Sequence, residues 1–235
     1  MKKWTTKSGY RIFLVLSGRS NVFLLTNGKI NVLVDTSISR LCEKLQKRLG
    51  SLGIKTVDYL VLTHTHFDHA ANAKSIKEKF GSVVIVQREE AGYLSSGDNI
   101  LPRGTTFLTR PLARLFGKKL VSRFRYESCN PDVLIDEVYD LGDMGFKACL
   151  IHTPGHTRGS MSLIVDDEIA LVGDTLFGVV KGSVFPPYAE DEKLMIKSWE
   201  KLLQTNCFLF IPSHGTANGR DLVERDYRRR TKNFS

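Results

Sequence analysis

The feature that most constrains this 235-residue chain is the segment 63–70, which reads THTHFDHA. It directly follows the apolar run 58–62, and such a run predicts a buried strand. Because side chains two apart on an extended segment point the same way, His64 and His66 form one pair. Asp68 and His69 follow where the chain turns into the next helix. The segment therefore predicts two pairs of polar side chains aimed at neighbouring points.

These residue types are ones that bind divalent metals. Neutral imidazoles and carboxylates suit zinc, and they also suit iron, manganese and cobalt. Two pairs aimed at adjacent points suggest two metal ions, which in bimetallic hydrolytic sites lie roughly 3.5–4 Å apart. We expect two divalent ions, with Zn²⁺ as the first choice and Mn²⁺ or Fe²⁺ as alternatives.

Two pairs do not complete two coordination shells, and the chain offers three further candidates. His156 stands in TPGHT, Asp174 in VGDT and His214 in IPSHG, and each follows an apolar strand-like run. Each is flanked by Gly, Pro or both, which favour tight turns. One such residue alone would be read as a structural histidine or a turn aspartate. Five of the six histidines share this arrangement, however, so we predict the metal ligands His64, His66, Asp68, His69, His156, Asp174 and His214.

The sixth histidine, His152, lies four residues before His156 at the end of a predicted strand. It has two interpretations. It is either a partner that orients a ligand through a hydrogen bond, or an ordinary core histidine.

The remaining pattern indicates an α/β protein. Apolar runs predict strands at 11–16, 22–26, 31–34, 83–86, 147–151, 160–165, 169–172 and 208–211. Helices are expected at about 38–49, 70–80 and 189–204, and from 220 onward. Strands in groups that alternate with helices predict mixed sheets with helices packed outside. A chain of this length with 42% hydrophobic residues forms a well-buried core as a single domain, 1–235.

Taken together, HxHxDH, TPGHT, GDT and the late SHG resemble the metallo-β-lactamase superfamily over about residues 20–220. The resemblance implies an αβ/βα four-layer sandwich, with two facing mixed β-sheets, helices outside, and the site at one edge of the sheets. It also implies how the ligands divide. His64, His66 and His156 would hold one metal, Asp68, His69 and His214 would hold the other, and Asp174 would bridge them.

Differences between this chain and known branches of the family reduce the range of activities that the resemblance implies. Antibiotic-hydrolysing members characteristically carry a cysteine where this chain has Asp174, so the resemblance disfavours true β-lactamase activity. The oxygen-reducing diiron members carry Glu at the place of His66. The segment Asp174–Phe177 is similar to glyoxalase-type thioesterases, but only about twenty residues follow His214 here, where those enzymes add a helical region. Quorum-signal lactonases typically have tyrosine at the place of Phe177.

We therefore expect a metal-dependent hydrolase acting on a small-molecule ester, thioester, lactone or phosphodiester. A hydroxide bridging two metals would attack the substrate, and Asp68 would be catalytic by orienting the nucleophile or receiving its proton. The alternative is a single-iron oxidoreductase of the persulfide dioxygenase type, because those relatives share the HxHxDH scaffold.

The formal charge of +9 is concentrated in one segment. Residues 103–125 carry seven Lys or Arg and no acid, and the rest of the chain carries only +2. They lie in a lid-like insert at about 95–131, in which Arg110, Arg114 and Lys118 are candidate substrate-binding residues. Three interpretations remain: a solvated surface helix, a lid that steers an anionic substrate, or contact with a membrane or nucleic acid.

Features of the sequence also indicate the cellular compartment of the protein. The apolar run 12–16 is too short for a signal-peptide core, and no stretch has the length of a membrane span. The four cysteines lack CxxC spacing and are expected to be free thiols. We expect a cytoplasmic protein.

Overall fold

The structure is a computed structural model that describes residues 2–98, 104–105 and 124–232. Its first sheet has seven strands in sequence order. They are β1 (Lys3–Thr5), β2 (Arg11–Leu16), β3 (Val22–Thr26), β4 (Asn31–Val34), β5 (Tyr59–Val61), β6 (Val83–Gln87) and β7 (Val133–Ile135). Pairing is antiparallel from β1 to β4 and parallel from β4 to β7. The sheet is therefore mixed, as expected from the sequence.

The second sheet has six strands in the order β13-β12-β11-β10-β9-β8. They are β8 (Val138–Asp140), β9 (Ala148–His152), β10 (Met161–Val165), β11 (Ile169–Leu171), β12 (Leu209–Ile211) and β13 (Asn218–Gly219). Strands β11 and β12 are parallel, and the other neighbours are antiparallel. Because β9 and β11 are both antiparallel to β10, strands β9, β11 and β12 run in the same direction.

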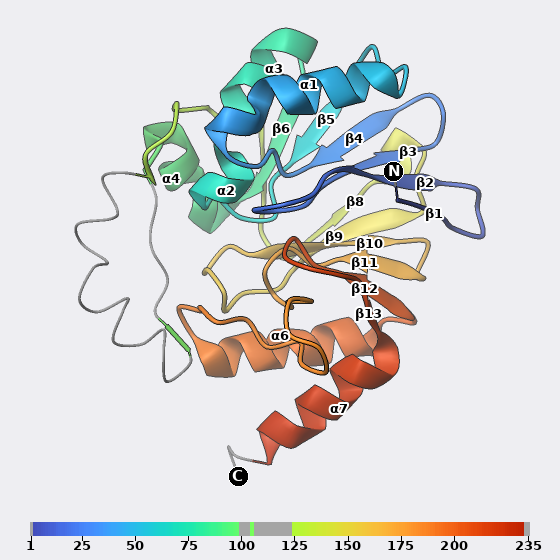
Figure 1. The fold of residues 1–235 in the computed structure, drawn as a ribbon, viewed down its shortest axis with the longest axis vertical. Coiled ribbons are helices and arrows are strands. Elements are labelled where there is room, and N and C mark those ends of the chain that lie inside the picture. Colours follow the sequence, from blue (N-terminus) through green and yellow to red (C-terminus); the bar gives the residue numbers. More distant parts are fainter. Residues whose placement is uncertain (1, 99–103, 106–123, 233–235) are drawn as a thin grey trace.

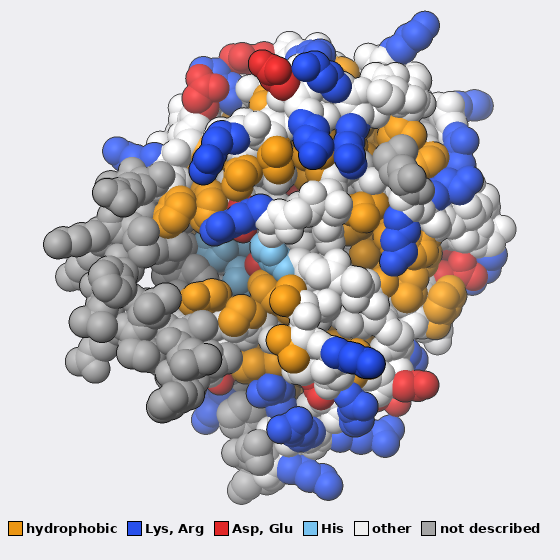
Figure 2. Space-filling model, viewed as in Figure 1, with side chains coloured by type: hydrophobic (Ala, Val, Ile, Leu, Met, Phe, Trp, Pro, Cys, Tyr) orange, Lys and Arg blue, Asp and Glu red, His pale blue; other side chains and the backbone are white. Residues whose placement is uncertain are grey.

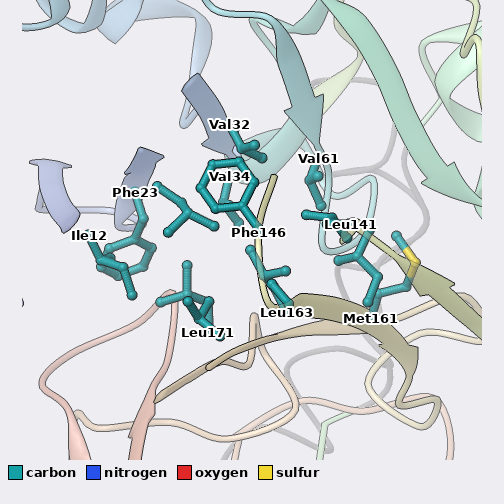
Figure 3. Packing of buried hydrophobic residues seen from close by; sticks show 14 of the residues in the cluster. Ile12, Phe23, Val32, Val34, Val61, Leu141, Phe146, Met161, Leu163 and Leu171 are labelled. Atoms are coloured by element: carbon teal, nitrogen blue, oxygen red, sulfur yellow. The ribbon is translucent and has the colours of Figure 1, made fainter. Parts of the chain in front are cut away.

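Helices cover the outer faces of the two sheets (Figure 1). On the first sheet lie α1 (Cys42–Ser51), α3 (Ala73–Phe80) and α4 (Ala91–Ser96), while α6 (Glu192–Gln204) and α7 (Arg220–Thr231) lie on the second. Between the sheets is a separate core to which both contribute, including Phe23 and Val34 from one and Leu163 and Leu171 from the other (Figure 3). This confirms the predicted αβ/βα sandwich. Each such buried side chain contributes about 1.5–3 kcal/mol.

Two predicted helices begin or divide at different places. The helix expected at 70–80 is two helices, α2 (Phe67–Ala70) and α3, because Asn72 between them bonds elsewhere. Its side-chain amide donates to the carbonyls of Thr36, Ser37 and Ile38. The helix expected from 189 begins at Glu192, because the Asp191 carboxylate caps it by accepting from Leu194 N at 2.9 Å.

Short elements escaped the sequence analysis. Strands β1, β7, β8 and β13 have only two or three residues each, so they show no periodicity. The four cysteines are free thiols, as expected.

Helix α6 supports two loops that leave the second sheet. Trp199 is fully buried, and its indole Nε1 donates to the Thr175 carbonyl at 2.7 Å. Ser198 Oγ donates to the Pro154 carbonyl at 2.6 Å. Gly155 lies so close to α6 that a Cβ there would stand 2.2 Å from Met195 N. The loops after β9 and β11 are therefore fixed by direct contact with one helix.

Replacing Trp199 with Phe tests this support. Trp199→Phe keeps an aromatic ring but removes the donor to the buried Thr175 carbonyl, so we expect the free energy of unfolding to fall by about 2 kcal/mol. Urea denaturation measures the change. Phe208→Leu, at a side chain that is 57% exposed, is the control and should change it by less than about 0.5 kcal/mol. Equal stability of the Trp199→Phe variant and the wild type would contradict the assignment.

Candidate metal centre

The chain segments that follow the parallel strands lie together at one edge of the sandwich. Strands β4 and β5 end there in the first sheet, and β9, β11 and β12 end there in the second. Carboxyl ends of strands that run in one direction share an edge, and loops beyond them commonly form binding sites. Figure 2 shows histidine side chains at the floor of a hollow whose rim carries basic and hydrophobic side chains.

Three buried histidines form the first group. His64 and His66 come from the loop after β5, and His156 comes from the loop after β9. The Nε2 atom of His64 lies 2.9 Å from Nδ1 of His66, and Nε2 of His156 lies 3.1 Å from the same Nδ1. Three imidazole nitrogens that converge in this way are a donor set typical of zinc.

The second group is Asp68, His69 and His214, whose ligand atoms lie within 4.8 Å of one another. Asp68 and His69 belong to α2, and His214 follows β12. The Asp68 Oδ2 atom lies 3.7 Å from Nε2 of His214. A carboxylate and two imidazoles also suit a divalent cation.

Asp174 contacts members of both groups. Its Oδ2 lies 3.3 Å from Nε2 of His214 and 3.4 Å from Nε2 of His156, and its Oδ1 lies 3.5 Å from Nε2 of His69. The structure thus brings together all seven side chains that the sequence singled out. Asp174 lies between the two groups, and its bridging of two metals stays a prediction.

Hydrogen bonds on the outer side orient three of the rings. His69 Nδ1 lies 2.8 Å from the Asp35 carboxylate, and His156 Nδ1 lies 2.9 Å from the Tyr188 carbonyl. His64 Nδ1 lies 3.2 Å from the Thr63 hydroxyl. A ring that donates through one nitrogen keeps a lone pair on the other. For His69 and His156 that other nitrogen faces the cluster.

Unpaired atoms show that the cluster suits a cation. Within the described residues, His69 Nε2 and Asp174 Oδ1 are buried and have no hydrogen-bond partner, and the same holds for His66 Nε2. Leaving a buried polar atom unpaired costs roughly 1–3 kcal/mol. A divalent ion between His69 Nε2 and Asp174 Oδ1 would satisfy both atoms, so the residues present fit a metal.

Burial and neighbouring charges give the histidines different protonation states in the absence of metal. Burial, together with the nearby imidazoles, places the pKa of His64 and of His66 well below the usual value. Burial acts the same way on His69, but the carboxylates of Asp174 and Asp35 outweigh it and raise its pKa to about 10. Metal binding at His69 would therefore release a proton.

The Asp35 carboxylate connects both sheets to the cluster. It is fully buried after β4, where its backbone has a φ of 62°. It accepts from Thr63 N at 2.8 Å, from the Thr63 hydroxyl, and from Ser213 Oγ at 3.0 Å, in addition to its contact with His69. Thr63 precedes His64 and Ser213 precedes His214, so one side chain positions three predicted ligands.

Glu90 links the two loops that form the first group. Its buried carboxylate accepts from the backbone N and the hydroxyl of Thr65, and from Gly159 N at 3.2 Å. A Cβ at Gly159 would stand 2.5 Å from Glu90 Cγ, so glycine is required for this approach. Tyr126 donates its hydroxyl to the Thr65 carbonyl at 2.8 Å from the other side.

Of the other predicted site residues, the structure describes His152. His152 has ring-nitrogen contacts with the Glu137 carboxylate at 3.2 Å and the Arg158 carbonyl at 2.7 Å, so it braces the loop of His156 and contacts no ligand side chain through either nitrogen. Arg110, Arg114 and Lys118 lie outside the described residues. Of the insert, Thr105 N donates to the Pro187 carbonyl at 2.9 Å, next to Tyr188.

Sequence reasoning missed Asp35 and Glu90. Asp35 follows an apolar strand as the predicted ligands do, and that signal could have found it. Glu90 stands beside Glu89 in a short helical segment, and only the structure shows that it is the buried one of the two.

A sandwich of this topology with a His/Asp cluster at its strand ends defines a class of metal-dependent proteins. The sequence pattern of the metallo-beta-lactamase superfamily matches residues 17–214, and the chain belongs to this family.

Two relatives are similar over most of their length. A probable metallo-hydrolase of Methanocaldococcus jannaschii is 32% identical over 160 residues, which cover 67% of this chain and 68% of the relative. A hydroxyacylglutathione hydrolase of Haemophilus influenzae is 28% identical over 177 residues, covering 74% of this chain and 76% of its own.

Solved structures show the same fold. A metallo-beta-lactamase superfamily protein from Sulfolobus tokodaii has a TM-score of 0.65 at 24% identity, with 89% of this chain and 79% of the other covered. A metallo-beta-lactamase from Cronobacter sakazakii has a TM-score of 0.68 at 16% identity, with 100% of this chain and 93% of the other covered.

Among the residues that the structure describes, no helix has the length and apolar character needed to cross a membrane.

Asp35→Asn tests the role of the connecting carboxylate. The amide has one acceptor oxygen where the carboxylate has two, so we expect a loss of about 2–3 kcal/mol in unfolding free energy and a fall of about 10–100-fold in metal affinity. Denaturant titration and competition with a fluorescent zinc chelator measure the two effects. Asp226→Asn is the matched control, since Asp226 is also buried but accepts from Val184 N at 2.8 Å in another region. Asp226→Asn should lower the free energy of unfolding without lowering metal affinity. An equal loss of metal affinity in both variants would contradict the proposed role of Asp35.

Proposed function

We propose that the protein is a dinuclear metal-dependent hydrolase that cleaves an ester-type bond in a small-molecule substrate, with thioesters as the first class to test. The observation that carries the proposal is the position of Asp174. Its Oδ2 lies near His156 of the first group and near His214 of the second, so the carboxylate is shared between two ligand groups. The similarity to a hydroxyacylglutathione hydrolase supports the thioester class.

Each ligand group would hold one cation. His64, His66 and His156 would bind the first, Asp68, His69 and His214 the second, and Asp174 would contact both. Nitrogen and oxygen donors in these proportions favour zinc, and manganese or iron also accept them. When bound, such ions lower the pKa of water toward neutrality and polarise a substrate carbonyl or phosphoryl oxygen.

The chain's own residues supply positioning and proton handling. Asp68 is only 9% exposed and lies beside His214, where its carboxylate can accept a proton from an attacking water molecule. The ring of Phe177 stacks on His214 with centroids 4.7 Å apart and excludes water from one side of that imidazole. The outer hydrogen bonds of His69 and His156 keep their inner nitrogens directed at the centre.

The alternative, a single-iron oxidoreductase, requires only one ligand group. The seven residues instead form three overlapping sets of possible ligands. Two of these sets have no residue in common: one is His64, His66 and His156, and the other is Asp68, His69 and His214. A dinuclear hydrolase would use both sets, whereas a single-iron oxidoreductase would leave one of them without an ion.

A substrate panel tests the proposal. Zinc- or manganese-loaded protein should hydrolyse at least one of an acylglutathione thioester, a p-nitrophenyl ester, a lactone and bis-p-nitrophenyl phosphate. Asp68→Asn should lower kcat by about 100-fold or more because it removes a proton acceptor. Asp143→Asn, at an exposed position in the turn Gly142–Met144, is the control and should keep kcat.

Oxygen consumption with a persulfide by iron-loaded protein, in the absence of hydrolysis of any panel member, would contradict the hydrolase and favour the alternative.

A further inference from the structure

A cleft of about 250 Å³ lies beside the candidate centre. Its lining includes Phe67, which directly precedes Asp68, and three arginines that come from distant parts of the sequence: Arg19, Arg40 and Arg125. The cleft and the cluster of metal-ligand residues are therefore connected by consecutive residues, since Phe67 lines the cleft and Asp68 belongs to the cluster.

Arg19 stands at the boundary between the cleft and the centre. It lies in the loop between β2 and β3, and its Nε is 3.7 Å from Oδ2 of Asp68. Its guanidinium carbon is 5.2 Å from the centre of the Phe67 ring. The contact with Asp68 is long and the side chain is 57% exposed, so most of the guanidinium donors remain available to a ligand.

The other two arginines differ in how far their charges are compensated. Arg125 contacts the Asp98 carboxylate through Nε at 2.7 Å and Nη2 at 2.6 Å. Arg40 lies in the helical turn Ser39–Leu41, is exposed, and has no carboxylate partner in the described part of the chain. The lining therefore keeps a net positive charge even after the ion pairs with Asp68 and Asp98 are counted.

Two stacked aromatic rings belong to the lining of the cleft. Phe67 and Phe124 stack with ring centroids 4.2 Å apart and an angle of 21° between their planes. Arginine over this pair of rings suits a ligand with a short apolar body and an anionic end.

A second, larger cleft shows why charge compensation matters. It is lined by Lys74 and Lys77 among others, but both lysines are paired, with Glu127 at 3.3 Å and Asp132 at 2.6 Å. That cleft also lies away from the predicted ligands, at the end of α3. Of these two clefts in the described part of the chain, the cleft of Arg19 is the one that combines uncompensated cations with contact to the centre.

We propose that this cleft binds an anionic group of the substrate, a carboxylate or a phosphate, while the bond to be cleaved lies over the metal centre. Guanidinium groups bind both anions through paired hydrogen bonds. The inference rests on the proposed hydrolase function and adds a substrate class: acyl compounds that carry a second, negatively charged group a few carbon atoms from the scissile carbonyl.

Two esters with the same leaving group test the proposal: mono-4-nitrophenyl glutarate, which ends in a carboxylate, and 4-nitrophenyl butyrate, which is neutral. In the double variant Arg19→Gln/Arg40→Gln, the ratio of kcat/KM for the glutarate over the butyrate should fall about tenfold, mainly through KM. The matching double lysine variant, which keeps the charge, should retain most of the ratio. Metal content measured for each variant separates loss of anion binding from loss of metal.

Arg11→Gln is the matched control. Arg11 also lies over a phenylalanine ring, with its guanidinium 5.9 Å from the centre of Phe13, but it stands at the opposite end of β2. It should leave the ratio unchanged.

Calorimetry with glutarate and with phenyl phosphate gives a readout that does not need turnover. At least one probe should bind the metal-loaded wild type, and its Kd should rise about tenfold in the double glutamine variant. The probe that shows this dependence identifies carboxylate or phosphate as the anion. Dependence of Kd on the arginines without hydrolysis of either ester or of any member of the substrate panel would support the anion cleft and overturn the hydrolase. An unchanged ester ratio with an unchanged Kd, or no binding of either probe, would overturn the anion cleft.

Discussion

The buried carboxylate of Asp35 is the interaction on which the rest of the structure depends. A fully buried charge is tolerated only when it is paired and hydrogen-bonded, and here the partners are Thr63, His69 and Ser213. Thr63 belongs to the loop after β5 in the first sheet, and Ser213 belongs to the loop after β12 in the second. Satisfying one charge therefore fixes the relative positions of two sheets and of the segments that carry the predicted metal ligands.

Glycine residues allow the segments that carry the predicted ligands to lie close to one another. A Cβ at Gly173 would lie 2.8 Å from Cβ of Thr63, and a Cβ at Gly215 would lie 2.2 Å from the backbone carbon of Gly178. Side chains at these glycines would separate the loops that bear Asp174 and His214 from the rest of the cluster. The glycines beside Asp174 and His214 thus have a packing function in addition to shaping turns.

The sequence was sufficient to predict much of this arrangement, since apolar runs gave the longer strands and the HxHxDH segment with its three later partners indicated the cluster. It did not show β1, β7, β8 and β13, because pairing with a neighbouring strand rather than periodicity identifies these segments. It did not divide the helix expected at 70–80, because the amide of Asn72 bonds to a distant loop. The roles of Asp35, Glu90 and Arg19 also depend on contacts between segments far apart in sequence. His152 had two open interpretations, and its bonds to Glu137 and Arg158 place it beside the His156 loop.

The central claim is that seven converging side chains bind two cations. Anomalous diffraction from a crystal of the zinc-loaded protein, with metal quantified in the same sample, tests it most directly. The account predicts two peaks per chain, one beside His64, His66 and His156, the other beside Asp68, His69 and His214, and Asp174 in contact with both. A single peak at full loading, or zinc bound away from this edge of the sandwich, would contradict it.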